Sequence, residues 1–86
     1  MDYTVIGRRW FDKVNGNTYH STRVYKNGEE IGYSGMQYGY GNQWEYTGLE
    51  IIKKDDPSIE ANALWKLKEQ GHTIVTTVSD GLKREL

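Results

Sequence analysis

Residues 8–28 read RRWFDKVNGNTYHSTRVYKNG, and their two Asn-Gly pairs separate runs of β-prone residues. An Asn-Gly pair between such runs is a strong signal for a tight hairpin, because both central residues of a type I′ turn need positive φ. The stretch therefore predicts an antiparallel meander of three strands, at residues 3–14, 18–26 and 29–38.

The register of the first hairpin decides which side chains of the first strand face the core, and the sequence leaves two registers open. A shift by one residue moves every side chain of a strand to the opposite face. A three-residue turn places Ile6 and Trp10 on the core face with Val24, whereas a two-residue turn places Val5 and Phe11 there. We favour the three-residue turn, which assigns five residues to the opposite, open face: Arg9, Phe11, Ser21, Arg23 and Tyr25.

The second turn predicts different roles for two neighbouring residues. A two-residue turn at residues 27–28 pairs Val24 with Ile31 and Arg23 with Gly32. Because adjacent strand residues point to opposite faces, Val24 should lie under the helices and Arg23 on the open face. We therefore predict a structural role for Val24 and a functional role for Arg23.

A first helix is predicted over residues 43–54. Asn42 is a suitable N-cap, and Glu45 stands three residues later, as in a capping box. Apolar residues recur at helical spacing and should face inward: Trp44, Gly48, Leu49, Ile51 and Ile52.

A second helix is predicted from Asp56-Pro57 to Gly71, because proline suits the first helical position and glycine suits the residue after the C-terminus. Its apolar stripe consists of Ile59, Ala63, Leu64 and Leu67. Residues 72–79 are β-rich and should add a fourth strand. The expected order is β-β-β-α-α-β, a single α+β domain spanning residues 1–86 with two helices packed on one sheet face.

Composition narrows the class of protein. The 86 residues include 11 basic and 12 acidic side chains, and the net charge of −1 is unlike that of a strongly basic nucleic-acid binder. The absence of cysteine excludes disulfides, cysteine zinc sites and thiol catalysis. The chain contains no apolar run of membrane-spanning length and no recognisable signal peptide. We interpret it as a soluble cytoplasmic protein that does not act on a membrane.

The sequence offers few groups for catalysis or metal binding. His20 with Arg9 or Arg23 supplies the residue types of a metal-free nuclease, although a strand histidine more often bonds only a neighbour. The adjacent aspartates at 55–56 point in different directions, and His20 and His72 lack metal-ligand spacing. We expect no metal and no cofactor, and we favour a protein that is not an enzyme.

Binding is the function class that the side chains favour. Aromatic and basic groups on an open sheet face can stack single-stranded nucleic acid, and Tyr, Trp and Arg are also enriched where proteins meet. The YGYG motif at residues 38–41 precedes the first predicted helix, whose N-terminal amides could hold an anion. The residues predicted to bind are Arg9, Phe11, Tyr19, His20, Arg23, Tyr25, Tyr38 and Tyr40.

Three segments also carry a resemblance that spans most of the chain: RRWFDKVNGNTYHSTRV, YGYG, and TVSDGLKREL at the end. In these the chain resembles a family of small uncharacterised proteins from bacteriophages and prophages. It departs from the family at residues 34–36, where the relatives have a more apolar, proline-containing stretch. The resemblance implies a phage or prophage origin and action inside a bacterial host, but it implies no activity and no site residues.

Together these observations predict a small accessory protein that binds a host or phage protein without catalysis. A homodimer is a further option for its partner. The alternative function is binding of single-stranded RNA or DNA by the same sheet face, and a metal-free nuclease is the weakest of the three.

Overall fold

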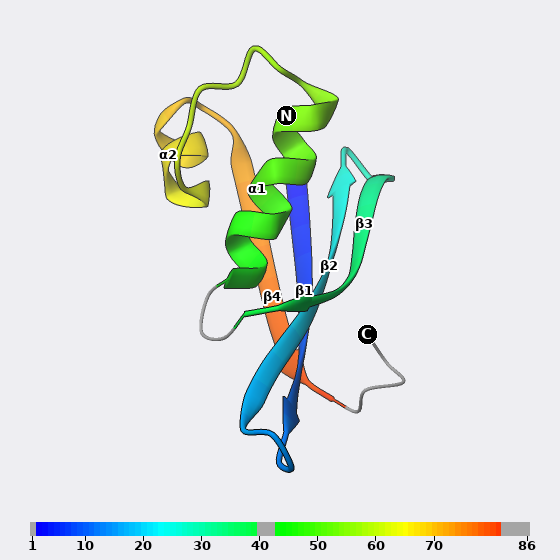
Figure 1. Cartoon of the computed structure of the whole chain (residues 1–86). Helices are drawn as coiled ribbons and strands as arrows, with labels where there is room; N and C mark the ends of the chain where they lie inside the picture. The colour runs from blue at the N-terminus through cyan, green and yellow to red at the C-terminus, as the bar shows by residue number, and fades with distance from the viewer. Residues whose placement is uncertain (1, 40–42, 82–86) are drawn as a thin grey trace.

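A computed structural model describes residues 2–39 and 43–81 and contains six elements in the order β-β-β-α-α-β (Figure 1). They are β1 (Asp2–Asp12), β2 (Asn17–Lys26), β3 (Glu29–Tyr38), α1 (Gln43–Asp55), α2 (Leu64–Glu69) and β4 (Thr73–Asp80). The four strands form one mixed sheet in the order β3-β2-β1-β4, in which β1 is antiparallel to β2 and parallel to β4. The predicted α+β fold is confirmed. Neither of these helices is long and apolar enough to cross a membrane.

The core lies between the helices and one face of the sheet. Its buried residues come from the strands and from both helices, and include Tyr3, Val5, Val24, Trp44, Leu49, Ile52, Leu64, Leu67 and Ile74. Two glycines let α1 lie close to the sheet. A Cβ at Gly7 would be 2.7 Å from ring atoms of Trp44, and one at Gly48 would be 2.7 Å from Cγ1 of Val5. The predicted inward stripe of α1 is therefore confirmed, with Ile51 packed at its margin.

The register that we favoured for the first hairpin is wrong. Val5 pairs with Val24 and is fully buried, as the alternative register required for its face. Ile6 and Trp10 consequently point away from the helices. Phe11 shares the face of Val5 but lies toward the hairpin tip, where 55% of its surface is exposed.

The loop of this hairpin explains the register. It spans residues 13–16 and is longer than either predicted turn, because Asp12 already pairs with Asn17. The Asp12 carboxylate accepts hydrogen bonds from the amides of Val14 and Asn15, and the Gly16 amide donates to the Asp12 carbonyl at 2.7 Å. These local bonds close the turn early, which is a common action of aspartate side chains.

The second hairpin has the predicted two-residue turn, but its pairing changes beyond it. Asn27 and Gly28 both have positive φ, and Lys26 pairs with Glu29. The register then shifts by one residue at a bulge, so that Val24 lies opposite Gly32, and the predicted pairing of Val24 with Ile31 is wrong. The same shift places Tyr33, and not Gly32, opposite Arg23.

The bulge has a packing reason. A Cβ on residue 32 would clash with the side chain of Ile51 in α1. The shift brings Gly32, which has no side chain, under the helix. A bulge commonly re-aims side chains in this way.

The second helix is shorter than predicted, because residues 56–63 form an irregular connection. The Asp56 carboxylate accepts hydrogen bonds from the backbone amide and the hydroxyl of Ser58, which holds a turn where a helix was expected. Ile59 and Ala61 of this connection are buried. Asn42, the predicted cap of α1, lies outside the described residues.

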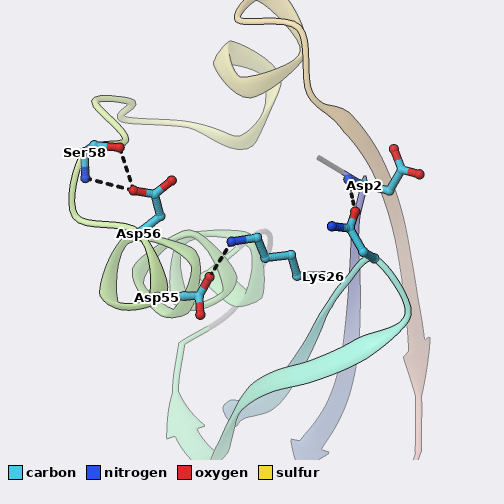
Figure 2. A network of polar contacts seen from close by, with 6 residues as sticks. Asp2, Lys26, Asp55, Asp56 and Ser58 are labelled. Carbon is cyan, nitrogen blue, oxygen red and sulfur yellow. Dashed lines mark hydrogen bonds and ion pairs between the residues drawn. The ribbon is translucent and has the colours of Figure 1, made fainter.

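Polar contacts join the ends of several elements beside this connection (Figure 2). The Lys26 ammonium at the end of β2 forms an ion pair of 2.9 Å with Asp55 at the end of α1. This hydrogen bond to Asp55 raises the pKa of Lys26, and the hydrogen bonds from Ser58 lower the pKa of Asp56. The Asp2 amide donates to Oδ1 of Asn27, which ties the start of β1 to the second turn.

Candidate functional site on the open face of the sheet

The face of the sheet that points away from α1 and α2 is called the open face. Residues that pair across strands share a face, so the even-numbered residues of β1 lie there with the odd-numbered residues of β2. The larger side chains of the open face include Ile6, Arg8, Trp10, Tyr19, Arg23, Tyr25, Glu30, Tyr33, Tyr38 and Val75. No described helix packs on this face.

An aromatic row crosses three strands of the open face and consists of Trp10, Tyr19 and Tyr38. These residues are register partners in β1, β2 and β3. The rings of Trp10 and Tyr19 are stacked with centroids 5.7 Å apart and an interplanar angle of 23°. Tyr38 meets Tyr19 edge-on at 5.8 Å and is 65% exposed. Both arrangements are favourable geometries for aromatic pairs, so the contacts among the three rings stabilise their side-chain conformations.

Arg23 lies on the same face, four residues after Tyr19 in β2, and is held in a defined position. Its Nε lies 2.9 Å from Oε1 of Glu30, and its guanidinium lies 4.8 Å from the ring centroid of Tyr33. Both charged side chains are about half exposed, so the ion pair contributes little to folding stability. Its effect is to order the arginine next to an exposed tyrosine. Arg8 adds a second exposed cation to the open face, two residues before Trp10.

The structure brings together four of the residues predicted to bind. Tyr19, Arg23, Tyr25 and Tyr38 all lie on the open face. Tyr40 lies outside the described residues.

Two predicted placements are corrected. Arg9 and Phe11 lie on the opposite face, because β1 is shifted relative to the register that we favoured. Arg9 there forms an ion pair of 3.1 Å with Asp80 at the end of β4.

Sequence reasoning missed three aromatic or basic residues of the open face, namely Arg8, Trp10 and Tyr33. Arg8 and Trp10 were missed because we favoured the three-residue turn. The two-residue turn would have placed both residues on the open face. Tyr33 reaches Arg23 only through the bulge in β3.

His20 lies under α1 and is only 3% exposed. Its Nε2 is 2.8 Å from the hydroxyl of Thr47, and its Nδ1 is 3.3 Å from the carbonyl of Gly39. The Thr47 hydroxyl also lies 3.3 Å from the Gln43 carbonyl, to which it donates, so His20 and Thr47 form one network with the first turn of α1. The protein itself therefore occupies both nitrogens, and the histidine fastens α1 to β2 on the face away from Arg23.

The described residues do not assemble a metal site. Within residues 2–39 and 43–81, no group of three His, Asp or Glu side chains is arranged to hold a metal ion. The open face instead presents groups suited to noncovalent binding, namely aromatic rings and two guanidinium groups.

Comparison with known proteins adds no second source for this interpretation. No protein-family model, no curated protein and no solved structure matches this chain.

Proposed function

We propose that this protein works by binding another protein, without catalysis, through the open face of its sheet. The observation that carries the proposal is the aromatic row of Trp10, Tyr19 and Tyr38, which no described helix covers. The resemblance to phage and prophage proteins supports a host or phage protein as the partner. That setting and a cytoplasmic location stay predictions from the sequence.

The composition and order of the open face favour a protein partner. Tyr, Trp and Arg are the residues that most often dominate the binding energy of protein interfaces. The contacts among the rings, and those that hold Arg23, fix these side chains before a partner arrives. Less conformational entropy is then lost on binding, which favours affinity.

The charge of the open face argues in the same direction. Its two arginines are Arg8 and Arg23, and Glu30 partly neutralises the second. Affinity for nucleic acid rests on many phosphate contacts, and a chain with a net charge of −1 supplies few. A protein surface needs no such excess of positive charge.

A pull-down from bacterial lysate with matched variants tests the proposal. We expect the wild-type protein to recover a stoichiometric partner, and Tyr38→Ala and Trp10→Ala to lose it. Trp65→Ala is the control, because Trp65 is a 58% exposed tryptophan of α2, away from the open face. Equal recovery by all three variants would contradict the proposal, as would the absence of any partner. Thermal melts must show that each variant is folded.

Single-stranded RNA or DNA is the second candidate ligand, and one observation favours it. Trp10 and Tyr19 stack on a sheet face near Arg8, and aromatic rings beside cations are the means by which sheets bind unpaired bases. Fluorescence anisotropy with a labelled oligonucleotide decides this candidate. Tight binding that weakens steeply with salt and is lost in Trp10→Ala would support it over a protein partner.

A further inference from the structure

The second notable surface is the outer edge of β4. This strand ends the sheet, and among the described elements it packs mainly on β1 and α2. Residues 73–79 read TIVTTVS, which is β-prone and contains no charge, glycine or proline. Val75 and Val78 are 52% and 40% exposed. Such an edge is a template for pairing with another strand, and proteins usually protect it.

The opposite edge of the sheet shows that protection. β3 is interrupted by two register irregularities, contains Gly32 and Gly35, and begins with Glu29 and Glu30. Bulges, glycines and charges all discourage further strand pairing. The β4 edge has no bulge in its ladder with β1. The β3 edge therefore discourages pairing with a further strand, whereas the β4 edge permits it.

The backbone groups of β4 that do not pair with β1 follow a regular pattern among the described residues. The Gly81 amide donates to the Arg9 carbonyl at 2.8 Å, so odd-numbered residues here turn their peptide groups toward β1. Peptide groups alternate along a strand. Ile74, Thr76 and Val78 therefore turn their amides and carbonyls to the outer edge.

We infer that a second copy of this chain pairs there, with the two β4 strands antiparallel about a two-fold axis at Thr76. In an antiparallel pair, residues directly opposite each other lie on the same face of the sheet, and this register meets that requirement. It places Ile74 opposite the partner's Val78 and Val75 opposite the partner's Thr77. Thr76 lies opposite its own copy. Two four-stranded sheets then become one sheet of eight strands.

The side chains of β4 are compatible with those of a second β4 strand in this register. In this register no like charges meet, because Asp80 is the only charged residue of β4. At each end His72 lies opposite the partner's Asp80, whose side chain is 81% exposed and already paired with Arg9. Each exposed valine gains a branched neighbour. Because the β3 edge is protected, pairing stops at two copies.

The arrangement is independent of the proposed function. A two-fold axis perpendicular to the sheet places both open faces on the same side, so that the dimer displays two aromatic rows. Neither row takes part in the pairing of the β4 edges. Loss of dimerisation and loss of partner binding are therefore separable measurements.

Sedimentation equilibrium with charge variants at the axis tests the inference. Thr76 is exposed, and its backbone amide is not used by the ladder with β1, so Thr76→Lys and Thr76→Glu should fold. Over about 1 μM to 1 mM, we expect the wild-type protein to reach the mass of two chains. Each variant alone should keep the mass of one, because like charges then meet at the axis. An equimolar mixture of the two variants should recover the mass of two.

Control measurements separate this edge from the open face. Tyr38→Ala should remain dimeric. Amide hydrogen exchange should slow at Thr76 and Val78 when the wild-type protein dimerises, and should stay fast in the variants. A wild-type protein that remains monomeric overturns the inference, and so does a dimer that both charge variants leave intact. Failure of the mixture to restore the dimer also contradicts it.

Discussion

Neighbouring residues of β2 show how one strand serves two purposes. Val24 is fully buried beneath α1, and Arg23, next to it, reaches Glu30 and Tyr33 on the open face. The sequence predicted the two faces correctly from strand alternation. It predicted an uncovered arginine opposite Gly32, and this was wrong, because the bulge in β3 brings Tyr33 opposite Arg23.

Truncation of these two residues should separate stability from binding. Val24→Ala removes buried methyl groups and should lower the free energy of unfolding by about 1–3 kcal/mol. Arg23→Ala removes only half-exposed contacts and should cost about 1 kcal/mol or less, while weakening partner binding. Urea denaturation of both variants checks the first expectation and the pull-down checks the second. Equal losses of stability would assign Arg23 a mainly architectural role.

At the scale of elements, the seating of α1 depends on a missing side chain in β1. The ring of Trp44 occupies the space that a Cβ at Gly7 would need, and Trp44 is itself buried. A buried ring has little room to move in a close-packed core. The close approach of α1 to the sheet is therefore encoded by glycine as much as by apolar residues.

Gly7→Ala should destabilise the protein by about 1–3 kcal/mol through overpacking. Gly35→Ala is the matched control, since Gly35 is also a strand glycine but a Cβ there would meet only Tyr33, at 3.9 Å. We expect the control to change stability by about 0.5 kcal/mol or less. Thermal denaturation compares the two. A neutral Gly7→Ala would show that α1 can shift to accommodate a methyl group.

The end of α1 should respond to acid. The hydrogen bonds from Ser58 lower the pKa of Asp56 below its ordinary value of 3.8, so folding favours the ionised carboxylate. The resulting stabilisation is fully present above the unfolded pKa and is lost as the pH falls through the lower folded pKa. Ser58→Ala should therefore be less stable than the wild-type protein at neutral pH, and the difference should shrink below about pH 3.8. Urea denaturation across this range measures it, and a difference that does not depend on pH would refute the coupling.

At the scale of the whole molecule, local signals predicted the elements but not their exact alignment. Asn-Gly pairs and helical apolar spacing are local, and they located the three strands of the meander and α1. The loop at residues 13–16 depends on which bonds the Asp12 side chain makes, and the bulge in β3 depends on Ile51, which is distant in sequence. The aromatic row needs both registers to be right, so only its members in β2 and β3 were foreseen.

The parallel pairing of β1 with β4 has a consequence for how the chain reaches this fold. Arg9 and Asp80 are neighbours in the sheet but stand 71 positions apart in sequence. Contacts of such long range slow folding, because a large loop must close before they are gained. During synthesis from the N-terminus, the meander can form while one side of β1 is still without β4, which is made later. For that interval β1 is paired with β2 on one side only, and its protection from misassembly depends on how quickly β4 is made.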